Sequence, residues 1–205
     1  MVKKNTVGTE MQIKKAAAKL FIEKGFDATS TREIADASGS NVALINYYYR
    51  SKQHLYEVIV MEAIGAFFEP MMPIFDNKET SLNDKFEELV GVYTDFLLKH
   101  RDLPLFVITE MRRNPDLVMK GIPLETLKQT SFYAQVVDKL GEDVGGLPYF
   151  GHLILNVLGM LMMPMLVAPV AKKMTGLDQQ KFVEAMNIRK CMLPLWINTM
   201  AELAE

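Results

Sequence analysis

Apolar side chains recur at helical spacing through most of the chain. Between Glu10 and Lys24 they fall at three- and four-residue steps, and Gly25 follows as a C-terminal stop. The run from Ser30 to Glu33 has the spacing of a capping box, which predicts a short helix ending at Gly39. The same signals predict further helices at residues 42–49, 52–68, 82–99, from 103 onward, 115–140 with an interruption at Pro123, 148–168 and 178–203. The sequence therefore predicts an all-α fold of about nine helices, with no convincing strand.

The composition fits a soluble globular protein. The 205 residues are 49% hydrophobic and 23% charged, which excludes disorder as the main state of the chain. The single cysteine, Cys191, cannot form an internal disulfide, and its apolar neighbours predict a buried, unreactive thiol. The N-terminus lacks the pattern of a secretory signal, so a cytoplasmic location is expected.

Charge is distributed unevenly along the chain. Residues 1–56 hold nine Lys and Arg against five Asp and Glu, whereas the remainder holds 14 basic and 20 acidic residues. A basic head on an acidic body indicates that the head is the part that meets a polyanion such as nucleic acid. Ordinary variation in surface charge is the alternative.

Residues 144–171 carry no formal charge if His152 is neutral, and this stretch is long enough to span a bilayer. Two adjacent glycines, three prolines, His152 and Asn156 argue against a membrane span, because they shorten the apolar run and place polar groups at membrane depth. The pattern favours a helix that is buried or lies in a subunit interface. A membrane-associated helical protein is the alternative.

The helices predicted at residues 31–38 and 42–49 are joined by a tight turn containing Gly39. A helix, a Gly-containing turn and a second helix form the helix-turn-helix unit, whose second helix enters the DNA major groove. Small and polar residues occupy the N-terminal end of this second helix, which is the end that reaches base edges. On this pattern alone, a generic helical hairpin is the alternative.

Individual residues strengthen the interpretation. They are Ala17, Leu20, Phe21, Gly25, Phe26, Thr29, Thr31, Ile34, Ala35, Ser38 and Gly39, followed by the run from Asn41 to Tyr49 and by Ser51, Lys52 and Leu55. This stretch closely resembles the N-terminal DNA-binding domain of TetR-family transcriptional repressors, and the rest of the chain matches only as a long helical pattern. The resemblance implies a cytoplasmic homodimer whose DNA-binding heads separate or reorient when a small molecule enters the body.

The resemblance and the exposed positions of the motif together give the expected DNA contacts. They are Thr31, Arg32, Asn41, Val42, Ala43, Asn46, Tyr47, Tyr48 and Lys52. The family makes phosphate and occasional base contacts at the positions of Thr31 and Arg32, and a phosphate contact at the position of Lys52. Arg50 stands where the family has Gly or Pro and adds a charge near the DNA. For Arg32, an ion pair with Asp36 at i+4 is the alternative.

The body is rich in Met and Phe, which together can form an adaptable apolar cavity for a ligand. Polar residues interspersed among them are candidates to orient that ligand. The expected pocket residues are Phe68, Met72, Phe96, His100, Glu110, Phe132, Asn156 and Met160. An ordinary hydrophobic core is the alternative for each of them.

The last two predicted helices carry more apolar residues than one small domain is expected to bury in its own core. The family pairs the two corresponding helices across a two-fold axis, so the resemblance implies an isologous dimer interface. On the last helix the expected interface residues are Phe182, Met186, Leu193, Trp196 and Met200.

Signatures of catalysis and metal binding are absent from the sequence. His54, His100 and His152 are too scattered for helical metal spacing, and no nucleophile or phosphate-loop motif occurs. We therefore expect no catalytic residue, no metal and no cofactor. A small enzyme with an apolar pocket is the alternative of a different class.

Together these observations predict a ligand-responsive transcriptional repressor. A DNA-binding domain is expected at residues 1–56, and an effector-binding and dimerisation domain at residues 57–205. The expected partners are palindromic double-stranded operator DNA, a small and largely apolar effector and a second copy of the chain, with no membrane.

Overall fold

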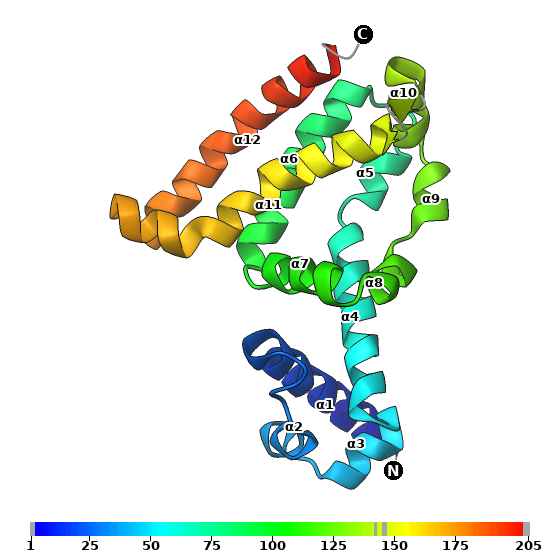
Figure 1. The fold of residues 1–205 in the computed structure, drawn as a ribbon, viewed down its shortest axis with the longest axis vertical. Coiled ribbons are helices and arrows are strands. Elements are labelled where there is room, and N and C mark those ends of the chain that lie inside the picture. The colour runs from blue at the N-terminus through cyan, green and yellow to red at the C-terminus, as the bar shows by residue number, and fades with distance from the viewer. Residues whose placement is uncertain (1–2, 142, 145–146, 203–205) are drawn as a thin grey trace. The chain divides into compact units, whose positions relative to one another are not determined.

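The computed structural model describes residues 3–141, 143–144 and 147–202 (Figure 1). In these residues the helices are α1 (Lys3–Lys24), α2 (Thr31–Ser38), α3 (Val42–Tyr49), α4 (Lys52–Phe68), α5 (Met72–Asp76), α6 (Leu82–Lys99), α7 (Leu103–Arg113), α8 (Pro115–Gly121), α9 (Leu124–Lys128), α10 (Ser131–Leu140), α11 (Tyr149–Thr175) and α12 (Gln179–Glu202). Two-residue strands β1 (Asp143–Val144) and β2 (Leu147–Pro148) pair antiparallel. The predicted all-α fold is confirmed, with α5 as an additional short helix. The segment predicted as one interrupted helix at residues 115–140 is divided into α8, α9 and α10.

Helix α11 is longer than the sequence predicts, because it continues through Pro164 and Pro169 to Thr175. A proline lacks the N–H that would bond the carbonyl four residues earlier. For Pro164 that carbonyl belongs to Met160, and the guanidinium of Arg189 donates to it at 3.0 Å. A side chain of α12 thus replaces the bond that the proline removes, and α11 need not end there.

The chain forms two compact units. The first comprises Met1–Gly65 and Phe106–Ile122, and the second comprises Ala66–Leu105 and Pro123–Glu205. Helices α4 and α7 each contribute residues to both units. The boundary expected between residues 56 and 57 divides the DNA-binding function from the effector-binding function, not one compact unit from the other, and it stays a prediction.

Aromatic rings and aliphatic side chains fill the core of the first unit. Phe21 meets Tyr56 edge-on with ring centroids 5.0 Å apart, and Phe26 lies 4.6 Å from the same tyrosine ring. Ile13 and Ile45 are fully buried with them. This core holds α1, α3 and the first turns of α4 together.

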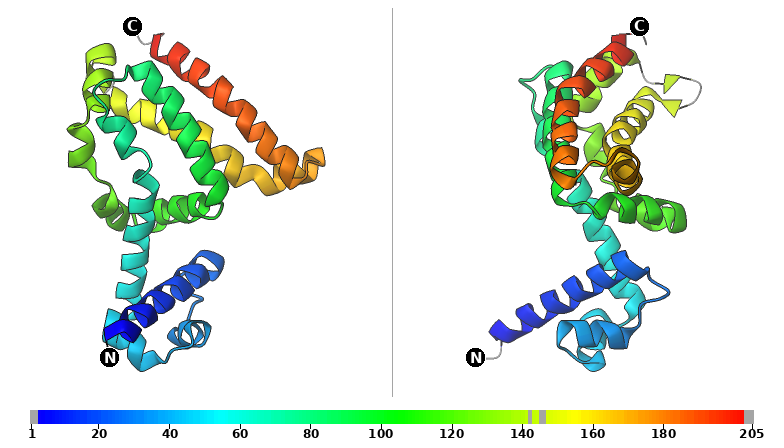
Figure 2. Two further views of the ribbon diagram at one scale, coloured as in Figure 1. Left: turned by 180° about the vertical axis from the view of Figure 1, so that it is seen from behind. Right: turned by 90° about the vertical axis from the view of Figure 1, so that its left-hand side faces the viewer.

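The second unit is built around α6, along which α12 runs in both views of Figure 2. Phe132 of α10 stacks on Phe75 at 4.3 Å and meets Phe86 of α6 edge-on. Phe182 and Leu193 of α12 are buried in the same unit. These aromatic and aliphatic contacts form the second core.

The dimer face expected on α12 is wrong at three positions, because Phe182, Met186 and Leu193 are buried within the unit. Trp196 is exposed as expected, and the side chain of Met200 lies outside the described residues. Among the described side chains of α12, the large apolar residues that are exposed are instead Ile188, Met192, Leu195 and Trp196. Cys191 is also exposed, so the expectation of a buried thiol is wrong.

The charge-free stretch forms most of α11. By length and composition, the segment Phe150–Thr175 could cross a membrane, and less than half of its most apolar part is buried within the chain. Leu155, Met163 and Val170 are among its exposed residues. This helix therefore leaves an apolar face that the chain itself does not cover.

Candidate nucleic-acid interface

Capping contacts define the ends of α2 and α3. Ser30 Oγ accepts the Glu33 N–H at 3.2 Å and the Glu33 carboxylate accepts the Ser30 N–H at 2.8 Å, which confirms the predicted capping box. Gly39 ends α2 with φ of 64°, a conformation that glycine adopts at little cost. Asn41 Oδ1 accepts the N–H of Leu44 at 2.9 Å and caps α3. The caps fix the turn between the two helices.

The carboxylate of Glu33 also connects α2 to α1. Lys24 Nζ donates to it at 2.7 Å. The hydrogen bond from Lys24, followed by those from the backbone and hydroxyl of Ser30, lowers the pKa of Glu33 to about 2. This half-buried capping group is therefore ionised at neutral pH.

One face of α3 is held by the core of the first unit. Ile45 and Tyr49 are buried, and the Tyr49 hydroxyl donates to the carbonyl of Glu10 at 3.2 Å. Burial, followed by the negative charges of Glu10 and Glu62, raises the pKa of Tyr49 to about 12. Because α3 is anchored on this side, its other face is turned outward.

The expected DNA contacts lie at the start of α2, along α3 with its N-cap, and at the start of α4. Arg32, Asn41, Ala43, Asn46 and Tyr47 are exposed, whereas Thr31, Val42, Tyr48 and Lys52 are half-buried. Tyr47 is 77% exposed, and its ring meets that of Tyr48 edge-on at 5.2 Å. No ion pair between Arg32 and Asp36 occurs in the described residues.

Lys52 has a structural contact that sequence reasoning missed. Its ammonium donates to the carbonyls of Phe26 at 3.0 Å and Thr29 at 2.9 Å, and it lies 4.1 Å from the centroid of the Phe26 ring. An ammonium has three N–H groups, so one remains for a phosphate. The two carbonyls approach Lys52 only in the folded chain, so no local signal could have predicted them.

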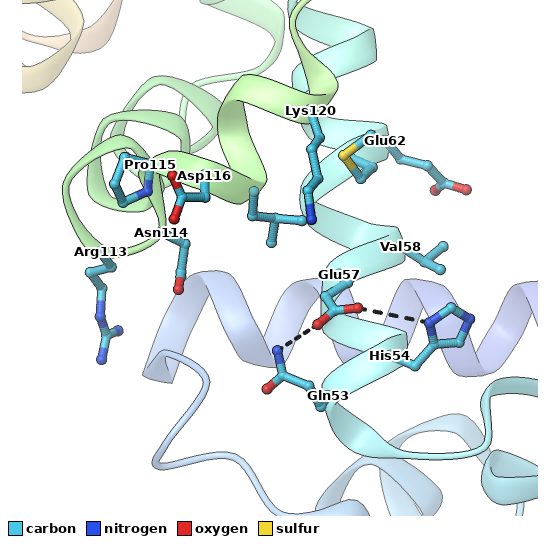
Figure 3. A pocket seen from close by; sticks show the side chains of 12 residues that line it. Gln53, His54, Glu57, Val58, Glu62, Arg113, Asn114, Pro115, Asp116 and Lys120 are labelled. Atoms are coloured by element: carbon cyan, nitrogen blue, oxygen red, sulfur yellow. Dashed lines mark hydrogen bonds and ion pairs between the residues drawn. The ribbon is translucent and has the colours of Figure 1, made fainter.

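A groove of about 670 Å³ lies in the first unit, between α4 and the segment from the end of α7 through α8 (Figure 3). Its apolar lining includes Val58, Met61 and Leu117, while both acidic and basic side chains also face it. Glu57 accepts a hydrogen bond from Gln53 at 2.9 Å, on the α4 side of the groove.

Glu110 connects this groove to the core of the first unit. Its carboxylate is buried and accepts a hydrogen bond at 2.8 Å from Asn114, which lines the groove. Burial, followed by the hydrogen bond and charge of Glu110, raises the pKa of Tyr56. Arg113 adds an ion pair with Asp27 at 2.7 Å. These contacts fasten the α7–α8 segment to α4 and to the loop after α1.

The residues expected to form a ligand pocket are divided between the units. Glu110 belongs to the first unit, and the other seven belong to the second: Phe68, Met72, Phe96, His100, Phe132, Asn156 and Met160. Phe132 is fully buried among aromatic rings, whereas His100 and Asn156 are exposed. Phe96 and His100 are in ring contact at 4.7 Å. Met160 lines a cavity of about 10 Å³, which is roughly the room one water needs.

Metal ligands do not gather in the described part of the chain. No cluster of three or more His, Cys, Asp or Glu side chains there could hold an ion.

Comparison with known proteins agrees with this geometry. The model of a family described as bacterial regulatory proteins, tetR family, matches residues 13–59, from α1 into α4. The probable HTH-type transcriptional regulator YttP of Bacillus subtilis is 31% identical over 164 residues, covering 78% of both chains. The chain belongs to the TetR family of transcriptional regulators.

Two further proteins resemble this regulator. The HTH-type transcriptional repressor KstR2 of Mycolicibacterium smegmatis is 25% identical over 125 residues, covering 52% of this chain and 61% of that protein. The crystal structure of a TetR family regulator from Marinobacter aquaeolei VT8 superposes with a TM-score of 0.67 at 14% identity, covering 92% of this chain and 97% of that one. The fold of the regulator is thus the family's fold over nearly its whole length.

Proposed function

We propose that this regulator is a ligand-responsive repressor that binds palindromic operator DNA as a homodimer in the cytoplasm and is released by a small, largely apolar effector. It has no catalytic activity in this proposal. Residues 1–56 carry the DNA contacts, and residues 57–205 carry the effector and dimer sites. The observation that carries the proposal is the outward face of α3, which follows a turn fixed by Gly39 at the end of α2 and Asn41 at the start of α3.

The proposed DNA contacts are the nine residues expected from the sequence, which lie on α2, on α3 with its N-cap, and at the start of α4. They are Thr31, Arg32, Asn41, Val42, Ala43, Asn46, Tyr47, Tyr48 and Lys52. Thr31, Tyr47 and Lys52 contact phosphate, and Arg32 and Asn41 lie nearer to base edges. A well-made base contact contributes roughly 1–3 kcal/mol of discrimination between bases. Phosphate contacts strengthen binding to all sequences alike.

Selection of bound fragments from random DNA, followed by affinity measurements, tests the DNA proposal. Asn41→Ser keeps a side chain able to cap α3 and should change the selected sequence. Asn83→Ser, at an exposed position of α6, is the matched control and should leave the preference unchanged. A protein that selects no preferred sequence would contradict the proposal.

The homodimer is supported by the uncovered apolar faces of α11 and α12. Large exposed apolar patches mark interaction sites, and the two helices belong to one unit. Leu195, which is 66% exposed, represents this face. We propose that a second copy covers it and sets the two heads about 34–36 Å apart, one helical turn of DNA.

Sedimentation of variants tests the dimer. Leu195→Glu should give a monomer at micromolar concentration, because a carboxylate would be buried without a partner. Leu105→Glu is the matched control, since this leucine of α7 is 62% exposed and lies outside α11 and α12. A stable monomer of the unaltered protein would refute the dimer.

The groove between α4 and α8 supports a ligand response, because 670 Å³ lies within the range of small-molecule sites, roughly 300–1,000 Å³. The predicted pocket of the second unit is the competing location. Helices α4 and α7 have residues in both units, so a ligand at either location can act on them. Typical coupling would change operator affinity about 5- to 150-fold.

Two tryptophan variants distinguish the locations. Met61→Trp fills the groove, and Met72→Trp fills the predicted pocket. The variant that abolishes the effector's influence on operator affinity identifies the site, with thermal melting as the control for overpacking. If no compound that binds the protein shifts operator affinity, the ligand-responsive part of the proposal is wrong.

A further inference from the structure

The backbone at Arg50, between α3 and α4, is unusual. Arg50 has φ of 64° and ψ of −43°, and it is the one non-glycine residue with positive φ among the described residues. The N–H of Ser51 bonds the carbonyl of Tyr49 at 2.6 Å, so Arg50 is the central residue of a three-residue γ-turn. The positive-φ form of this turn is rare and strained.

A glycine would relieve this strain, because it lacks the Cβ that makes positive φ costly. The chain uses glycine at the other described residues with positive φ, such as Gly25 and Gly39. Strain that persists at a residue with a side chain points to a function for that side chain.

We propose that Arg50 binds a DNA phosphate at the C-terminal end of α3, which rests on the proposed DNA-binding function. The side chain is exposed, and within the described residues it makes no ion pair or hydrogen bond. It follows Asn46 and Tyr47, which belong to the exposed face of α3. Its planar guanidinium can donate two parallel hydrogen bonds to phosphate oxygens.

Lys52, the neighbouring cation, cannot bind a phosphate as well as Arg50 can. Two of the three N–H groups of Lys52 are directed at the carbonyls of Phe26 and Thr29. Arg50 is thus the unengaged cation where α3 passes into α4. The competing explanation is that its charge stabilises the C-terminus of α3 through the helix dipole.

Three variants separate these explanations. Arg50→Gln removes the charge but keeps the strained backbone, and Arg50→Lys keeps both the charge and the strain. Arg50→Gly removes charge and strain together. Arg112→Gln, at an exposed arginine of α7 in the same unit, makes the same substitution outside the groove and is the matched control. Operator affinity is measured between 50 and 200 mM salt, alongside the melting temperature.

Arg50→Gln should weaken operator binding roughly ten-fold and lower the magnitude of the salt slope by about 0.9 for each head bound. Its melting temperature should stay unchanged. Arg50→Lys should recover the slope, and Arg50→Gly should bind as weakly as Arg50→Gln while melting no lower than the unaltered protein.

Three results would overturn the assignment. One is an unchanged salt slope in Arg50→Gln, and another is an equal loss of binding in Arg112→Gln. The third is a lower melting temperature of Arg50→Gln with binding retained, which would indicate the dipole role. If the unaltered protein binds no DNA, the proposed function itself fails, and that outcome is distinct from all three.

Discussion

Replacing Lys52 with methionine tests whether this residue stabilises the first unit as well as contacting DNA. Methionine has a similar length and flexibility, so the change removes the ammonium while largely keeping the packing of the side chain. The ammonium joins the start of α4 to the loop between α1 and α2 through the carbonyls of Phe26 and Thr29.

The expected loss follows from the contacts. Each hydrogen bond contributes about 1 kcal/mol, taken below the usual range for charged donors because Lys52 is only half-buried. The contact with the Phe26 ring adds about 0.5–1 kcal/mol. The free energy of unfolding should therefore fall by about 2.5–3 kcal/mol, which corresponds to about 5–12 °C in melting temperature for a chain of this size.

Thermal melting followed by circular dichroism, at one protein concentration, measures this change. Lys120→Met is the matched control and should stay within about 0.5 kcal/mol of the unaltered protein, because this lysine is exposed. A melting temperature of Lys52→Met equal to that of the control would refute the reasoning. The salt slope of operator binding, measured on the same protein, reports separately on the remaining N–H.

Two further predictions concern close packing and pH. Gly121→Ala should destabilise the protein by about 1–3 kcal/mol in denaturant titrations, because the new Cβ would lie 3.0 Å from side-chain atoms of Ile64. Gly91→Ala, where the new Cβ meets nothing within 4 Å, should instead be neutral or slightly stabilising. Because folding lowers the pKa of Glu33 from 4.5 to about 2, its contribution to stability is present above pH 4.5 and is lost as the pH falls toward 2. The difference in melting temperature between the unaltered protein and Glu33→Gln should therefore shrink over that interval, and a constant difference would contradict the assignment.

Local signals predicted the helix-turn-helix well, since its boundaries are set by residues close together in the chain. The capping box at Ser30 and Glu33, the left-handed Gly39 and the cap at Asn41 all lie where the sequence indicates. Each of these features requires contacts only within a few residues. The local sequence is therefore sufficient to predict them.

Features that depend on contacts between distant segments could not be predicted from local sequence. Helix α12 has apolar residues on more than one face, so periodicity alone could not decide whether Phe182 or Leu195 would pack inside the unit. At Pro164, the Met160 carbonyl that lacks its helical donor accepts a hydrogen bond from Arg189, which lies on another helix. The strained turn at Arg50 likewise carries no local signal, because arginine does not favour positive φ.

The discontinuous make-up of the first unit has a consequence for synthesis of the protein on the ribosome. The segment Phe106–Ile122 completes this unit, so the nascent chain lacks part of it when Gly65 has been added. Until then Tyr56 has no Glu110 beside it, and Ile64 has no Gly121 against it. At about 5–20 residues per second, translation from Gly65 through Ile122 takes roughly 3–11 s. The first unit therefore cannot finish folding before the whole of the second unit's first segment, Ala66–Leu105, has also been translated.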